Sequence, residues 1–153
     1  MPLSGAIAFS SLAAQVSHPD LSGTWILDHA RSDSSSFTPA SATFVVRQLG
    51  DSMVLDRDTP GTGHMHLIYT FDGSARVNTL RLVDTAVAAT STAEWHADTL
   101  VVHTTSEAGG GSLVQRDSWW LGPEAATLRI RREATYEGAP IGSPTLVFVR
   151  RPG

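Results

Sequence analysis

The pattern that predicts the fold is clearest in residues 90–105, which read TSTAEWHADTLVVHTT. Apolar and polar side chains alternate on both sides of Ala97-Asp98, and Trp95 and Leu100 flank that pair at equal distance. Alternation with a period of two predicts β-strands that bury one face, and a two-residue connection predicts a tight hairpin. The segment therefore predicts two antiparallel strands, with Trp95 and Leu100 on the same inward face.

The same period continues along the chain from Leu21 onward. Short runs rich in Val, Thr, Leu and aromatic residues are separated by clusters of Gly, Pro, Asp and Ser. No connection is long enough for a helical crossover between parallel strands. We predict about ten strands, near residues 23–28, 43–49, 52–57, 64–71, 76–82, 90–96, 99–105, 112–121, 125–135 and 145–150. Because closing a long meander removes its exposed edges, the expected fold is all-β, an antiparallel up-and-down barrel of eight to ten strands, with a two-sheet sandwich as the alternative.

The composition excludes several classes of function. The chain has 153 residues, no cysteine and a net charge of −4, and all 11 of its basic residues are arginine. Without cysteine there are no disulfides, thiolate nucleophiles or cysteine zinc sites, and without lysine there is no Schiff base or P-loop. The charge leaves no basic excess for phosphate groups, so nucleic acid is not an expected partner. No motif in the sequence indicates a cofactor, so none is expected.

Residues 1–17 read MPLSGAIAFSSLAAQVS and differ from the rest. They carry no charged side chain, and their apolar stretch is too short to cross a bilayer, so we expect no transmembrane segment. They resemble the apolar part and cleavage region of a secretory signal without its positive start. We therefore expect a signal-like or disordered segment over 1–17, a single barrel domain over 18–153, and a periplasmic or secreted protein.

The first predicted strand contains the motif Gly23-x-Trp25 within residues 20–28, DLSGTWILD. Together with the strand count, the chain length and Arg150 at the end of the last predicted strand, this motif resembles the calycin superfamily, which includes lipocalins and fatty-acid-binding proteins. The resemblance implies that Trp25 plugs one end of the barrel and that Arg150, or its neighbour Arg151, packs across the indole. Such a contact combines stacking with cation–π attraction.

The chain departs from the fatty-acid-binding proteins in two places. Residues 31–42 are too few for their helical lid, and their C-terminal Arg-x-Tyr carboxylate anchor is absent, with Arg129-x-Arg131 only a loose analogue. The chain is more similar to the small lipocalin-like domains of exported bacterial proteins.

Pairing Leu121 with Ala126 in the hairpin of residues 112–135 would place Asp117 opposite Ile130 on an inward face. On that face, and on the inward faces of neighbouring strands, aromatic and apolar side chains accompany a few polar ones, as in ligand pockets. The predicted ligand-binding residues are Tyr69, Trp95, Gln115, Asp117, Trp119, Leu128 and Arg132. The alternative is a filled core in which Asp117 and Arg132 satisfy each other.

By resemblance, the sequence predicts non-covalent binding or transport of a small hydrophobic or amphipathic ligand in the barrel. An alternative is a small barrel enzyme, an isomerase or cyclase in which Asp117 and Tyr69 transfer protons. A third is a metal-binding module on His64-x-His66, with a further ligand from Glu94, His96 or His103. No established catalytic motif is present, so we assign no catalytic or metal-ligating residue, and the oligomeric state stays open.

Overall fold

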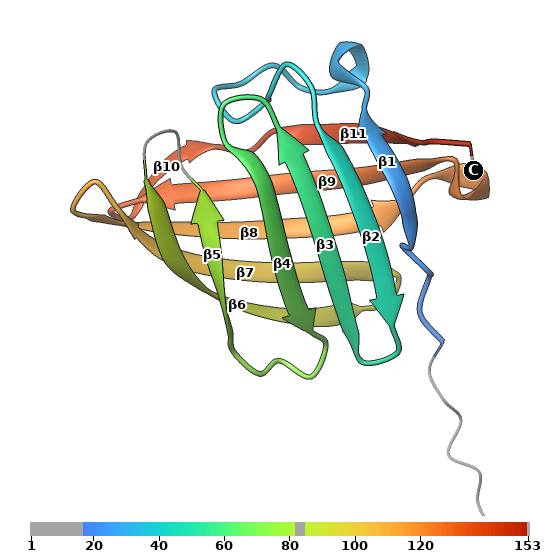
Figure 1. Cartoon of the computed structure of the whole chain (residues 1–153), viewed down its shortest axis with the longest axis horizontal. Coiled ribbons are helices and arrows are strands. Elements are labelled where there is room, and N and C mark those ends of the chain that lie inside the picture. Colours follow the sequence, from blue (N-terminus) through green and yellow to red (C-terminus); the bar gives the residue numbers. More distant parts are fainter. Residues whose placement is uncertain (1–16, 82–84, 153) are drawn as a thin grey trace, which may run out of the picture.

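The computed structural model describes residues 17–81 and 85–152 and contains eleven strands, two short 3₁₀ turns and no α-helix in these ranges (Figure 1). The signal-like prediction lies almost wholly outside the described residues, as does Leu82 at the end of one predicted strand. No helix in the described part has the length and hydropathy needed to cross a membrane. The strands are β1 (Gly23–Leu27), β2 (Thr43–Leu49), β3 (Ser52–Thr59), β4 (Gly63–Thr70), β5 (Arg76–Arg81), β6 (Ala86–His96), β7 (Thr99–Ala108), β8 (Gly111–Leu121), β9 (Thr127–Tyr136), β10 (Ala139–Gly142) and β11 (Thr145–Arg150).

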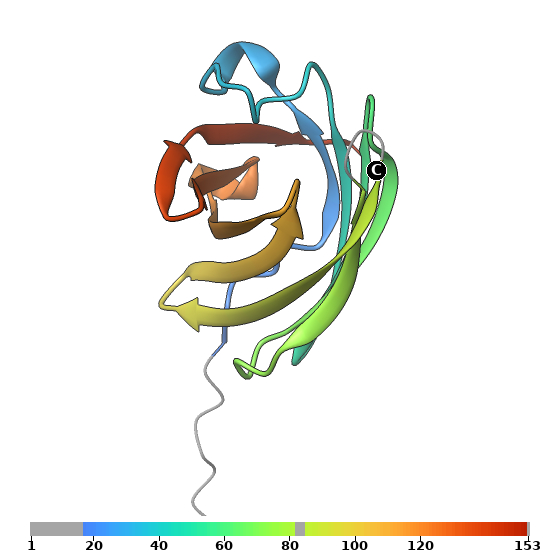
Figure 2. The same cartoon turned by 90° about the vertical axis from the view of Figure 1, so that its left-hand side faces the viewer.

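The strands form one antiparallel sheet that curls into a nearly closed barrel (Figures 1 and 2). Its order is β4-β3-β2-β1-β11-β9-β8-β7-β6-β5, so consecutive strands are neighbours almost throughout. The predicted all-β meander barrel is confirmed. The exception to simple order is β10, a four-residue strand that pairs only with β9. This strand was not predicted from the sequence, because Ala-Pro-Ile-Gly shows no alternation of apolar and polar side chains.

The barrel is closed by a side chain where its two end strands, β4 and β5, approach each other. Asn78 on β5 accepts a hydrogen bond from the Ile68 backbone N–H at 2.9 Å and donates one to the Ile68 carbonyl at 2.9 Å. Asn78 is buried, and its carboxamide makes the two hydrogen bonds to the Ile68 backbone that the backbone of a neighbouring strand would otherwise make. These two hydrogen bonds, called the seam below, connect β4 and β5, which are not paired with each other by backbone hydrogen bonds.

The register of β8 against β9 differs from the expected one by two residues. Leu121 lies opposite Leu128 rather than Ala126, and Asp117 lies opposite Arg132 rather than Ile130. The cause is a 3₁₀ turn over Pro123–Ala125, which lengthens the connection beyond a tight hairpin. Since side chains alternate with a period of two, a two-residue shift leaves every side chain on its predicted face.

The end of the barrel at which the chain enters β1 is closed by Trp25. The indole is fully buried, and its Nε1–H donates to the Leu21 carbonyl at 2.9 Å. The Arg150 guanidinium carbon lies 4.2 Å from the indole centroid, and its Nη1 donates to the Ser22 carbonyl at 2.8 Å. Gly23 has a φ of +147°, and a Cβ there would collide with Arg150, so only glycine leaves room for this contact.

Candidate functional site

A cavity of about 350 Å³ lies inside the barrel. This volume is at the lower end of the range for small-molecule sites. A second, smaller space of about 20 Å³, called the narrow extension below, shares Arg57, Tyr69 and Asp117 with the cavity and is also lined by Phe44 and Trp119. The main cavity is lined by Ser36, Phe37, Arg57, Thr62, Met65, Leu67, Tyr69, Leu80, Arg81, Thr104, Leu113, Gln115, Asp117 and Arg132.

Asp117 and Arg132 form a bidentate ion pair in the cavity wall. Arg132 donates from Nε to Oδ1 and from Nη2 to Oδ2 of Asp117, both at 2.9 Å. Their side chains are only 14% and 13% exposed. Burial alone would lower the pKa of Arg132, but the Asp117 carboxylate outweighs it and raises that pKa above its usual value. Because both carboxylate oxygens are engaged, the arrangement does not favour Asp117 as a free proton acceptor.

Arg57 is the second cation of the cavity, and the described part of the chain contains no ion pair that involves it. It continues the inward face of β3 after Met53 and Leu55, and its guanidinium carbon lies 5.6 Å from the Phe44 ring centroid. Its Nε–H is fully buried and has no hydrogen-bond partner. Burial, reinforced by the charge of Arg132, lowers the pKa of Arg57 to about 10, so the group still carries its charge at neutral pH.

Tyr69 supplies a hydroxyl to the same space. It lies on β4 and lines both the cavity and its narrow extension. Burial raises the pKa of Tyr69 well above its usual value, and the Asp117 carboxylate raises it further. The phenol therefore stays protonated over the physiological range, where it acts as a hydrogen-bond donor rather than a base.

The predicted ligand-binding residues do not all meet at this cavity. Tyr69, Gln115, Asp117 and Arg132 line it, Trp119 borders the narrow extension, and Leu128 is fully buried in the core. Trp95 lies elsewhere: its indole stacks on His18, with centroids 4.7 Å apart, and both line a separate surface groove. The alternation of side chains predicts which face a residue occupies, but not how far along the barrel it lies.

Among the cavity residues that were not predicted, the sequence could have indicated Arg57 but not Phe37. Arg57 ends the predicted strand 52–57 on the same face as Met53 and Leu55, which already placed a charge inside the barrel. Phe37 lies in the Ser/Pro-rich segment between β1 and β2, where no periodicity locates a side chain.

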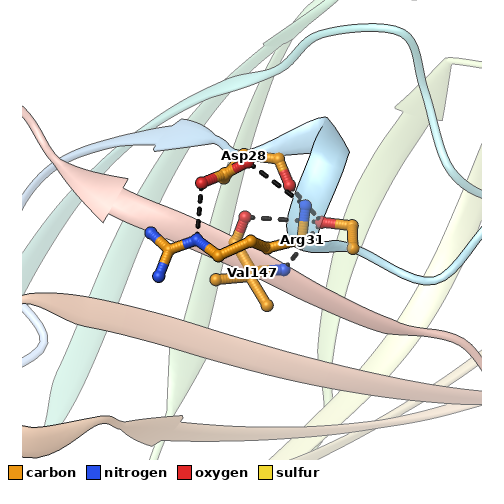
Figure 3. A network of polar contacts seen from close by, with 4 residues as sticks. Asp28, Arg31 and Val147 are labelled. Carbon is orange, nitrogen blue, oxygen red and sulfur yellow. Dashed lines mark hydrogen bonds and ion pairs between the residues drawn. The ribbon is translucent and has the colours of Figure 1, made fainter.

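A polar network fastens the segment that carries Phe37 to strand β11 (Figure 3). Asp28 caps the turn His29–Arg31 by accepting from the Arg31 backbone N–H, and its carboxylate also binds the Arg31 Nε–H at 2.6 Å. Ser32 donates to the Asp28 carbonyl and accepts from the Val147 N–H at 2.9 Å. These bonds anchor the start of the segment that places Ser36 and Phe37 at the cavity.

The histidines considered for a metal site lie on the outer wall. His66 Nδ1 is 2.8 Å from Asp56, and His64 Nδ1 is 3.1 Å from Asp58, each pair directly opposite across β3 and β4. Within residues 17–81 and 85–152, no three His, Cys, Asp or Glu side chains are arranged to hold a metal ion. The geometry is that of exposed cross-strand hydrogen-bonded pairs.

Comparison with known proteins finds similarity in structure only: no protein-family model matches the chain, and no curated protein does. A mutant of the fluorescent protein UnaG superposes with a TM-score of 0.59 at 13% identity, covering 87% of this chain and 97% of that one. Zebrafish ileal bile acid-binding protein, complexed with cholic acid, gives 0.56 at 9% identity, with 85% and 98% covered. Secretory abundant heat soluble protein 4 from Ramazzottius varieornatus gives 0.56 at 10% identity, with 86% and 94% covered. The chain has the fold of the calycin barrels, in the form of a nearly closed fatty-acid-binding-protein-like barrel.

Proposed function

We propose that the protein binds a small hydrophobic or amphipathic molecule, without covalent chemistry, inside the barrel. The observation that carries this proposal is the internal cavity of about 350 Å³, whose wall combines apolar side chains such as Met65, Leu67 and Leu113 with polar and charged groups at defined positions. A site of this kind gains affinity from burying apolar ligand surface and gains orientation from its polar groups.

Two further observations support binding over catalysis. The carboxylate and the phenol that could have transferred protons are a paired Asp117 and a Tyr69 held in its protonated form. A solved protein with the same fold, the zebrafish bile acid-binding protein, is complexed with cholic acid.

Two adjacent substitutions on β8 test the proposal. Leu113 lines the cavity, whereas its neighbour Val114 is 38% exposed on the outer wall. We expect the wild-type protein and Val114→Trp to bind the neutral dye Nile red with one-to-one stoichiometry and a blue-shifted emission. Leu113→Trp should lose this binding, because the indole occupies the cavity.

Circular dichroism would verify that both variants keep the β-barrel. Equal binding by all three folded proteins would place the dye on the surface. Absence of binding by folded wild-type protein, repeated with other neutral apolar probes, would contradict the proposed function.

A further inference from the structure

We infer that the ligand of this cavity carries a single negative charge and that its anionic head docks on Arg57. The inference rests on the proposed function and narrows the ligand to amphipathic monoanions such as carboxylic acids. It is carried by the charges and unpartnered atoms of the cavity wall.

The first observation is the charge of the lining. The chain as a whole carries a net charge of −4, yet the described residues of the cavity wall include three guanidinium groups, those of Arg57, Arg81 and Arg132, and one carboxylate, that of Asp117. An acidic protein has thus concentrated positive charge around its internal space. Such a lining attracts anions and disfavours cationic ligands.

The second observation is that the two inner arginines, Arg132 and Arg57, differ in their hydrogen-bond partners. Arg132 already directs Nε and Nη2 at the two oxygens of Asp117, which neutralises its charge. Arg57 has a buried Nε–H with no partner and no carboxylate in ion-pair contact in the described structure. A buried, unpaired donor on a charged group is costly, and an incoming carboxylate would satisfy both the donor and the charge.

The third observation concerns the head group's remaining contacts. Tyr69 and Gln115 line the same cavity, and Tyr69 keeps its proton. A carboxylate accepts several hydrogen bonds, so a phenol and a carboxamide are suitable additional donors. Arg81 is exposed to solvent. Once the Asp117–Arg132 pair is counted as neutral, Arg57 is therefore the one inner charge left for the ligand among the described lining residues. A monoanion matches this balance.

The test compares two ligands that share an alkyl chain and differ in the head group, decanoate and 1-decanol. Affinities are measured by titration calorimetry at pH 7.5 with the full chain. We expect decanoate to bind the wild-type protein roughly tenfold or more tightly than 1-decanol, the ratio expected for one hydrogen bond to a charged group.

Arg57→Met keeps an apolar stem of similar length and removes the charge. It should abolish the preference for decanoate while leaving the affinity for 1-decanol close to wild type. Arg116→Met is the matched control, because Arg116 lies on the outer face of β8 with its side chain 50% exposed. That variant should retain the full preference.

The outcomes separate the two proposals. If neither decanoate nor 1-decanol binds, the proposed function itself fails. If both bind the wild-type protein equally well, the cavity binds ligands but the assignment of an anion is wrong. If folded Arg57→Met retains the preference for decanoate, the anion docks elsewhere, and the assignment to Arg57 is overturned.

Discussion

Asp117 and Arg132 occupy directly opposite positions on β8 and β9, and the guanidinium holds both carboxylate oxygens at 2.9 Å. Removing one member of a buried ion pair costs about 3–5 kcal/mol, since the other charge is left uncompensated. We expect Asp117→Asn to lower the free energy of unfolding by an amount in that range, because Arg132 and Arg57 then lose the carboxylate that faces them in the cavity wall. Urea unfolding followed by tryptophan fluorescence measures the change.

The exposed pair of Arg116 and Glu133, with its nitrogen and oxygen 3.9 Å apart, provides the control. Glu133→Gln should cost less than about 1 kcal/mol, as surface pairs usually do. Equal decreases in the free energy of unfolding for Asp117→Asn and Glu133→Gln would show that the buried pair contributes no more to stability than the exposed one.

Arg57 is expected to oppose stability in the absence of a ligand. Its buried Nε–H has no partner, so replacing the charged group by an apolar side chain removes a desolvation cost. We predict that Arg57→Met raises the free energy of unfolding of the ligand-free protein by about 1 kcal/mol or more. Chemical denaturation of delipidated protein gives this value. A clear loss of stability would mean that Arg57 is needed for the fold rather than for a ligand.

Binding of an acid should depend on pH through Arg57, which faces Arg132, Tyr69 and Asp117. Its pKa, lowered to about 10 chiefly by burial and next by Arg132, means that the free protein loses this charge as the pH rises through that value. The affinity for decanoate should therefore be constant from pH 7 to 9 and fall above about pH 10, while the affinity for 1-decanol should not. Calorimetry across this interval tests the prediction. Parallel curves for the two ligands would count against it.

The seam between β4 and β5 depends on Asn78, whose carboxamide pairs with both backbone groups of Ile68. Asn78→Leu leaves a buried donor and a buried acceptor without partners, each costing about 1–3 kcal/mol. Asn78→Asp retains the acceptor but sets a carboxylate against the Ile68 carbonyl. We expect Asn78→Leu to destabilise the barrel and to accelerate amide exchange of Ile68, measured by hydrogen–deuterium exchange. Unchanged exchange at Ile68 would refute the role of the seam.

Gly23 and Arg150 lie against each other at the closed end of the barrel, so we expect the effects of substituting them to be coupled. Gly23→Ala places a Cβ into the Arg150 guanidinium and imposes a positive φ on a residue that disfavours it, at a cost of about 1–3 kcal/mol for the backbone alone. Since Arg150→Ala removes the collision but not the backbone strain, Gly23→Ala should cost less in that background. A double-mutant cycle measures the difference. Strict additivity would show that the two residues are independent.

The alternation of side chains was enough to predict ten of the eleven strands, the barrel and the inward faces, because one buried face per strand leaves a period of two in the sequence. The alternation could not predict how far along the barrel a residue lies. Trp95 was therefore grouped with residues at the cavity, although it stacks on His18 in a separate groove. The alternation also could not predict the exact pairing of Asp117, because the 3₁₀ turn Pro123–Ala125 shifts the register by two residues.

Arg57 shows a second limit of the sequence. Its place on the inward face follows from Met53 and Leu55, but whether its buried Nε–H has a partner depends on strands far away in the chain. Asp117 and Arg132 satisfy each other only because β8 and β9 bring them into register. The unpartnered Nε–H of Arg57, on which the ligand assignment depends, is therefore a property of the folded barrel.

The most direct test observes the Arg57 Nε–H itself. In a ¹⁵N-labelled sample, arginine Nε–H signals are assigned with Arg57→Lys and Arg132→Lys variants, and decanoate or 1-decanol is then added. We predict that decanoate shifts the Arg57 signal downfield and that the shift saturates at one equivalent, because a new charge-assisted hydrogen bond forms there. The Arg132 signal should move little, and 1-decanol should not reproduce the downfield shift. Saturable binding of decanoate with an unmoved Arg57 signal would contradict the account.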